Sequence, residues 1–199
     1  MSAPTIYYIR HGETDWNAQG RFQGSKDIPL NGIGRTQAIA AGEILEGLLV
    51  RDGFAASALS FVASPLGRAR TTMELARGVL KLPPADYGLD DRLREIGYGR
   101  WEVLTLPEMK LNDPAAFAFR STDTWGVAAP SGESYASVTL RVRDWCDSLR
   151  TSTVAVAHGG TMRALMVALG VATPLEAAAT PIGQGVVYLF RDGGLQKYS

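Results

Sequence analysis

Residues 5–17, TIYYIRHGETDWN, decide the fold that the sequence predicts. The first five of them, Thr5–Ile9, are β-branched or aromatic, which is typical of a buried strand, and Gly12 then allows the backbone to turn. His11 is therefore expected at the C-terminal end of a strand, where open α/β sheets bind their ligands. Arg10 beside it carries a planar set of donors that matches phosphate or carboxylate oxygens.

The second of the chain's two histidines follows the same pattern. Residues 153–157, TVAVA, predict another buried strand, which ends at His158-Gly159-Gly160. A single histidine after a strand is most simply explained as a cap or as a hydrogen-bonding core residue. Two histidines at matching positions of two strands instead indicate a functional site at one edge of a sheet.

Four short motifs together resemble one known family. Residues 10–14, RHGET, resemble the signature of the histidine phosphatase superfamily, the phosphoglycerate-mutase-like enzymes. Residues 64–69, SPLGRA, are similar to that family's second arginine motif, residues 93–95, LRE, to its acid motif, and residues 158–160, HGG, to its second histidine motif. The motifs follow the family's order over nearly the whole chain. The resemblance implies an α/β fold, a three-layer α/β/α sandwich around a mostly parallel central sheet.

The resemblance also implies a role for individual residues. It makes His11 the nucleophile that becomes a phosphohistidine, and Glu95 the donor of a proton to the departing alcohol. The catalytic set that it implies is His11, Glu95, His158, Arg10 and Arg68. The residues that we expect to bind the phosphate are Arg10, Asn17, Gln23, Arg68, His158 and Gly159. Neither a metal nor a cofactor is implied.

The spacing of apolar and turn-forming residues predicts the remaining elements. Helices are expected over 31–49, 66–80, 130–148 and 161–169, strands over 59–63 and 186–190, a turn-rich connection over 83–103, and a partly helical cap insertion over about 104–130. Arg68 is thereby placed near a helix N-terminus, whose free N–H groups and positive end attract anions. Glu133 is expected in the first turn of the helix over 130–148, where its charge suits the helix dipole.

Composition favours one α/β domain over residues 1–199. The chain is 46% hydrophobic and 20% charged, which is enough for a good core. Its 20 basic and 20 acidic residues cancel, so nothing favours nucleic acid as a partner, and an anion must be recognised by a local cluster. A small phosphate ester suits such a cluster. The oligomeric state is not determined by the sequence, and a homodimer is one option.

The sequence also gives an expectation for the cellular compartment of the protein. Residues 1–4 lead directly into the first predicted strand without the pattern of a signal peptide, and no apolar stretch approaches the roughly 20 residues that span a membrane. Cys146 is the only cysteine, so we expect a reducing cytoplasm. A cysteine phosphatase would need an arginine six positions later, where this chain has Ser152. Cys146 is therefore predicted to be a packed helix residue.

Departures from the family pattern favour a phosphatase over a mutase. The family's mutases place an arginine directly after the catalytic glutamate and an arginine pair in the cap, whereas this chain has Ile96 there and only single cap cations, Lys110 and Arg120. The apolar residues of the cap, Met109, Phe117, Phe119 and Trp125, favour an apolar or aromatic leaving group. The chain also ends within ten residues of the strand predicted at 186–190, which would leave the phosphohistidine open to water. Val103 stands where the family often has glycine, which brings the local backbone path into question.

Other chemistries compete with this interpretation. Residues 132–136, GESYA, are one residue short of a serine nucleophile elbow, but they follow no strand, and the order of the remaining esterase motifs is wrong. Metal-dependent hydrolysis lacks ligands, because there are two histidines and no His-x-x-x-His pair. Two alternatives stay open: a cofactor-dependent phosphoglycerate mutase, and a non-catalytic module that binds phosphate without turnover.

Overall fold

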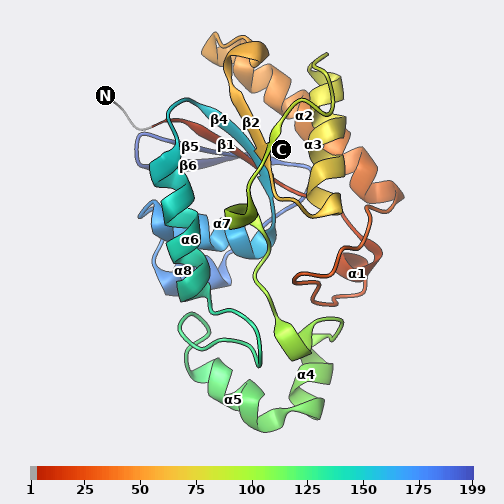
Figure 1. The fold of residues 1–199 in the computed structure, drawn as a ribbon, viewed down its shortest axis with the longest axis vertical. Helices are drawn as coiled ribbons and strands as arrows, with labels where there is room; N and C mark the ends of the chain where they lie inside the picture. Colours follow the sequence, from red (N-terminus) through yellow and green to blue (C-terminus); the bar gives the residue numbers. More distant parts are fainter. Residues whose placement is uncertain (1–3) are drawn as a thin grey trace.

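The computed structural model describes residues 4–199, in which six strands form one sheet in the order β3-β2-β4-β1-β5-β6 (Figure 1). The strands are β1 (Ile6–Arg10), β2 (Ser60–Ala63), β3 (Gly88–Leu89), β4 (Thr153–Ala157), β5 (Val187–Arg191) and β6 (Gly194–Tyr198). The pairs β1–β4, β2–β4 and β2–β3 are parallel, and β5 and β6 join antiparallel. The predicted α/β class and mostly parallel sheet are confirmed.

Helices cover both faces of this sheet. They are α1 (Asp15–Ala18), α2 (Gly32–Asp52), α3 (Gly67–Val79), α4 (Leu106–Asn112), α5 (Pro114–Thr122), α6 (Tyr135–Ser148), α7 (Gly159–Ala168) and α8 (Pro174–Ala179). Tyr7 and Ile9 of β1 are buried with the apolar residues of α2 and α3, while Ile6 and Tyr8 are buried with those of α6 and α7. The side chains of one strand thus alternate between two cores, which gives the three layers.

The central strands place the two histidines side by side. β1 and β4 are parallel and in register, with Arg10 opposite Ala157. The backbone N–H of His11 extends the ladder by donating to the carbonyl oxygen of Ala157 at 2.9 Å. His11 and His158 therefore leave the same edge of the sheet as direct neighbours, as the strand pattern predicts.

The structure differs from the predicted elements at several places. α2 continues to Asp52 instead of ending at 49, and the two-residue strand β3 lies within the connection expected over 83–103. The chain has a further strand, β6, because Asp192 and Gly193 both have positive φ, 51° and 74°, and form a tight hairpin turn after β5. α7 begins at Gly159, two residues earlier than expected, since His158 already serves as its N-cap. α6 begins only at Tyr135, where the side chain of Ser134 accepts the N–H of Ser137.

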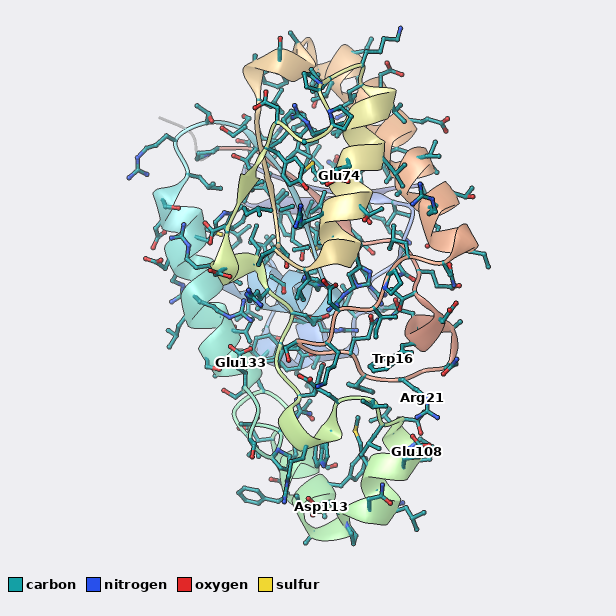
Figure 2. All side chains as sticks on the ribbon, turned by 45° about the vertical axis from the view of Figure 1, so that its right-hand side comes forward. Trp16, Arg21, Glu74, Glu108, Asp113 and Glu133 are labelled. Carbon is teal, nitrogen blue, oxygen red and sulfur yellow. The ribbon has the colours of Figure 1, made fainter. Side chains whose placement is uncertain are left out.

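The cap, α4 and α5, lies beyond the end of the sheet, at the bottom of Figure 1. Its entry is joined to the loop that follows α1. The N–H of Val103 donates to the carbonyl of Phe22 at 2.7 Å, and Arg21 pairs with Glu108 at 2.8 Å (Figure 2). Val103 adopts a φ of 78°, a conformation that strongly disfavours a β-branched residue. The backbone therefore keeps the path that a glycine would take, under strain.

Two further expectations can be compared with the packing. Cys146 is half-buried on α6 against the core, and burial raises the pKa of its thiol to about 12, so it is a packing residue as predicted. Over residues 4–199, no helix combines the length and apolar character needed to cross a membrane.

Candidate active site

The imidazole rings of His11 and His158 lie 5.1 Å apart between centroids and are tilted by 60°. Both are buried, with 2% and 0% of their surface exposed. Nδ1 of His11 lies 2.7 Å from the carbonyl oxygen of Gly12, which can only accept, so Nδ1 carries the proton. Nε2 of His11 is then left with its lone pair. Burial and the charges of Arg68 and Arg10 lower the pKa of His11 well below its usual value, so the ring is neutral.

Close backbone packing fixes the loop that carries His11. A Cβ on Gly12 would stand 2.1 Å from the carbonyl oxygen of Gly34 in α2, so only glycine allows this approach. The N–H of Gly12 donates to Oγ1 of Thr72 at 3.1 Å. Gln184 donates its amide to the carbonyl of His11 at 3.1 Å. The nucleophile candidate is thus held from α2, α3 and the loop before β5.

Two buried guanidinium groups flank His11. Arg68, in the first turn of α3, is fully buried and donates to the carbonyls of Gly24 and Lys26 at 2.9 and 2.5 Å. Arg10 donates to the carbonyl of Ile182 at 2.6 Å. Burial lowers the pKa of both groups. Within residues 4–199, Nε of each arginine is buried without an acceptor, which suits an anion bound between them.

His158 is fixed from behind by the sheet. Its Nε2 lies 2.7 Å from Oγ of Ser64, the first residue after β2. The hydroxyl of Tyr8 donates to its carbonyl at 2.7 Å and accepts its N–H at 3.0 Å. Burial, followed by the charge of Arg68, lowers the pKa of His158. In the part of the chain that the structure describes, Nδ1 of His158 is buried and has no hydrogen-bond partner.

Glu95 stands at the N-terminus of α7. Its Oε1 accepts the backbone N–H of Thr161 at 3.3 Å and that of Ile96 at 3.0 Å. A Cβ on Gly160 would lie 2.5 Å from this oxygen, so the approach of Glu95 requires glycine there. The carboxylate is therefore docked on the first turn of the helix that His158 caps.

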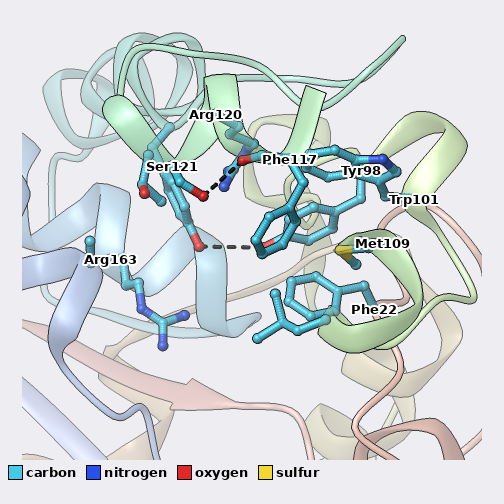
Figure 3. Close-up of a pocket in the computed structure, with 12 residues that line it drawn as sticks. Phe22, Tyr98, Trp101, Met109, Phe117, Arg120, Ser121 and Arg163 are labelled. Atoms are coloured by element: carbon cyan, nitrogen blue, oxygen red, sulfur yellow. Dashed lines mark hydrogen bonds between the residues drawn. The ribbon is translucent and has the colours of Figure 1, made fainter. Parts of the chain in front are cut away.

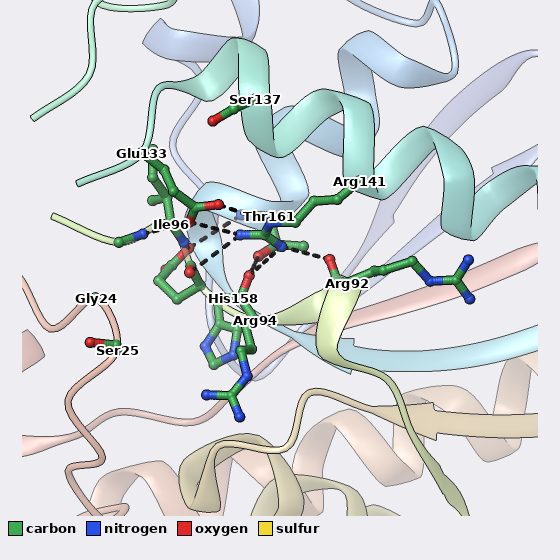
Figure 4. Close-up of polar contacts among 12 residues, drawn as sticks. Gly24, Ser25, Arg92, Arg94, Ile96, Glu133, Ser137, Arg141, His158 and Thr161 are labelled. Carbon is green, nitrogen blue, oxygen red and sulfur yellow. Dashed lines mark hydrogen bonds and ion pairs between the residues drawn. The ribbon is translucent and has the colours of Figure 1, made fainter. Parts of the chain in front are cut away.

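An ion pair between Arg141 and Glu133 holds the loop that carries Glu95 in place (Figure 4). Arg141 of α6 donates to the carbonyls of Arg92, Arg94 and Glu95 at 2.6, 2.8 and 3.4 Å. It also pairs with Glu133 at 3.2 Å, and Glu133 accepts the N–H of Gly97 at 2.9 Å. The expectation that Glu133 serves the dipole of its own helix is therefore wrong, because Glu133 precedes that helix and binds the Glu95 loop instead.

Most of the predicted site residues meet in one cavity of about 220 Å³. Those that line it are Arg10, His11, Asn17, Gln23, Arg68, Glu95 and Gly159. Oδ1 of Asn17 accepts the N–H and hydroxyl of Thr14 at 3.2 and 3.1 Å, so its Nδ2 remains as a donor. Gln23 is buried at 6% exposure. His158, which is fully buried, is not among the lining residues.

Sequence reasoning missed several residues that support the site. Ser64, Thr72 and Gln184 position His158 and the His11 loop, and Arg163 lines the cavity from α7. Ser64 had a usable signal, because it leaves β2 at the same sheet edge as the histidines. Among residues 4–199, no three His, Cys, Asp or Glu side chains converge as metal ligands.

Comparison with known proteins gives one consistent family. Residues 6–191 match the family described as the histidine phosphatase superfamily, branch 1. Glucosyl-3-phosphoglycerate phosphatase of Mycobacterium tuberculosis is 35% identical over 186 residues, covering 85% of this chain and 76% of the relative. The native structure of a mycobacterial glucosyl-3-phosphoglycerate phosphatase superposes with a TM-score of 0.77 at 30% identity, covering 94% and 89%. A 2,3-bisphosphoglycerate-dependent phosphoglycerate mutase of Beijerinckia indica is 29% identical, covering 94% and 90%.

Proposed function

The chain belongs to the histidine phosphatase superfamily, and from this premise we propose that it hydrolyses small phosphomonoesters through a phosphohistidine at His11. The observation that carries the proposal is the state of His11. Its ring is neutral, its Nδ1 is tied to Gly12, and its Nε2 keeps a lone pair between two buried guanidinium groups. A nucleophile beside preorganised cations is the arrangement that phosphoryl transfer requires.

In the first step, Nε2 of His11 attacks phosphorus, the bond from phosphorus to the ester oxygen breaks, and Glu95 gives its proton to that oxygen. In the second step, water attacks phosphorus, the bond from phosphorus to Nε2 of His11 breaks, Glu95 takes a proton from the water, and inorganic phosphate leaves. His11 and Glu95 are thereby returned to their starting states. The division of one displacement into two steps is the usual gain of covalent catalysis.

The remaining predicted residues bind the transferred group. Arg10, Arg68 and Asn17 line the pocket and offer their guanidinium and amide N–H groups to it. We propose that His158, whose ring centroid lies 5.1 Å from that of His11, joins them when the phosphoryl group is bound. Gln23 and the N-terminus of α7 at Gly159 complete the wall of the pocket. Each such donor, placed where negative charge develops, typically contributes about two to three orders of magnitude in rate.

We propose hydrolysis in preference to mutase activity. The similar proteins include named phosphatases and a named phosphoglycerate mutase, and the mycobacterial relative that is 35% identical is a phosphatase. Ile96, fully buried in the core, stands where the family's mutases have an arginine. We also propose that the reaction needs no metal, since the site offers cations from arginine instead. The single Cys146 agrees with a cytoplasmic setting.

A panel of phosphate esters tests the proposed function. The purified protein should release inorganic phosphate from phenyl phosphate at the same rate with and without a chelator. With 3-phosphoglycerate and its bisphosphate cofactor, it should form little 2-phosphoglycerate. Efficient isomerisation would favour the mutase alternative, and tight phosphate binding without any turnover would favour the binding module.

A further inference from the structure

A second cavity, of about 390 Å³, adjoins the pocket of His11 under the cap (Figure 3). It shares Phe22, Tyr98 and Arg163 with that pocket. An ester whose phosphate lies at His11 can therefore extend its leaving group into this cavity. We refer to it as the cap cavity.

The wall of the cap cavity is largely aromatic. Its aromatic residues are Phe22, Tyr98, Trp101, Phe117 and Tyr135. Phe22 and Tyr98 pack edge to face at 4.6 Å between ring centroids. Such a wall contacts an apolar or planar body better than a small polar alcohol.

Two arginines face the same space from opposite sides (Figure 3). Arg120 of α5 lies over the ring of Tyr135 at 6.0 Å, and its Nε and Nη2 are buried with no acceptor within residues 4–199. Arg163 of α7 donates Nη2 to the carbonyl of Thr180 at 3.1 Å, while its Nε is likewise unpaired among those residues. The described residues that line the cavity include no aspartate or glutamate. Two arginines thus line the cap cavity, and no described acidic side chain lines it with them.

The unpaired atoms of Arg120 define the kind of anion. Nε and Nη2 form one side of the guanidinium plane, and their two parallel N–H bonds match the two oxygens of a carboxylate. Buried donors are nearly always paired in folded proteins. A carboxylate on the leaving group would pair both donors of Arg120 and balance the charge of Arg163.

We propose that the substrate is a phosphomonoester of an amphipathic acid: an apolar or aromatic leaving group that carries a carboxylate at its far end, bound by Arg120 with support from Arg163. This inference rests on the proposed function and narrows its substrate class. Of the cap residues that favour an apolar or aromatic leaving group, Met109 and Phe117 line the cavity, whereas Phe119 points to solvent at 66% exposure. Arg120 adds a charged group to the same lining. Positively charged leaving groups are excluded by the same two arginines.

Phosphonates, which cannot be hydrolysed, test the inference without relying on turnover. Binding of 4-carboxybenzylphosphonate and its homologues with one and two added methylenes would be measured by titration calorimetry against the matching carboxamides. At least one acid should bind the wild-type protein about tenfold more tightly than its amide, since paired charged hydrogen bonds are the strong ones. Arg120→Gln should abolish this preference. Arg100→Gln, at an exposed surface ion pair with Asp113, should retain it.

Equal affinity for acid and amide at all three lengths would overturn the inference, and this comparison needs no variant. A preference of the same size in Arg120→Gln would also overturn it, whereas Arg163→Gln should only weaken the preference. Hydrolysis of the corresponding benzyl phosphates would be followed separately. A preserved acid preference without release of phosphate would support the second anion site and overturn the proposed function.

Discussion

The pocket around His11 and the cap cavity share a wall, yet they are built in different ways. The pocket is formed where β1, β2 and β4 end, and backbone pairing and glycine contacts fix its side chains. The cap cavity is formed mainly by side chains of α4, α5 and their flanking loops. In the proposed reaction, chemistry at phosphorus therefore depends on residues at the ends of the sheet strands, whereas the leaving group contacts the cap.

The largest expected effect on the rate comes from a change in the pocket around His11, and a change on the surface of the cap provides the comparison. His11→Asn should reduce phosphate release by about a thousandfold or more, at least ~4 kcal/mol in the barrier, because no neighbour can replace the nucleophile. Lys110→Gln, an exposed change in the cap, should alter the rate less than twofold. Steady-state kinetics on phenyl phosphate measure both. An Asn variant that keeps more than about a tenth of the rate would remove His11 from the mechanism.

A change at Glu95 should slow the hydrolysis of esters with poor leaving groups more than that of esters with good leaving groups. Glu95→Gln should slow an alkyl phosphate by about a hundredfold and an activated aryl phosphate far less, because only the alkyl oxide needs the proton. Arg141→Gln should show the same dependence on the leaving group at roughly a tenth of the size, since Arg141 positions the Glu95 loop.

Exposed Arg143 on the same helix provides the matched control, and Arg143→Gln should leave both substrates unaffected. Equal losses on alkyl and aryl esters would rule out proton donation by Glu95. An equal loss of rate on alkyl and aryl esters in Arg141→Gln would show that Arg141 has only a structural role.

The buried histidines should make stability depend on pH. Their pKa values are lowered in the folded protein, whereas in the unfolded chain they return to about 6.5. Above about pH 6.5 both histidines are neutral in the folded and in the unfolded protein, so the free energy of unfolding does not change. Below it the unfolded chain takes up protons that the folded one does not, so the free energy of unfolding should fall by about 2 to 3 kcal/mol between pH 7.5 and 5.5.

Urea unfolding at both pH values measures this loss. The double variant His11→Asn, His158→Asn should lose most of the pH dependence over this range. The same dependence in the double variant would show that other groups cause it.

The smallest expected effect lies where the two regions join. Val103→Gly should stabilise the protein by about 0.5 to 1 kcal/mol, because relief of a left-handed β-branched residue exceeds the entropy cost of glycine. The melting temperature should rise by roughly 2 to 3 °C at this chain length. Turnover of phenyl phosphate should not change, since the hydrogen bond to Phe22 is kept. A lower melting temperature would mean that the conformation is not strained.

Local signals in the sequence were sufficient to place His11, His158 and Arg68 at one edge of the sheet. Strand patterns at 5–9 and 153–157 placed both histidines at one sheet edge, and Pro65 placed Arg68 at a helix start. These patterns involve residues that are close in the sequence, so they can be recognised without the tertiary structure. The Asp192-Gly193 turn that creates β6 was equally local and was overlooked.

Other features depend on contacts between distant segments. The sequence predicts that Glu133 interacts with the dipole of the helix over 130–148, whereas in the structure it contacts Gly97 and Arg141. The surroundings of Arg120 likewise arise only when the cap folds over Tyr135. The extent of the chain as one domain, the role of each site residue and the oligomeric state remain predictions.

The central claim, that His11 carries the phosphoryl group, is tested most directly by trapping the intermediate. The protein would be mixed with a labelled phosphomonoester, quenched within milliseconds in alkali, and mapped by mass spectrometry. The account predicts one label on His11 that is stable in alkali and lost in acid, and no label in His11→Asn. An acid-stable label on serine, or phosphate release from the wild-type protein with no labelled histidine at any quench time, would contradict it.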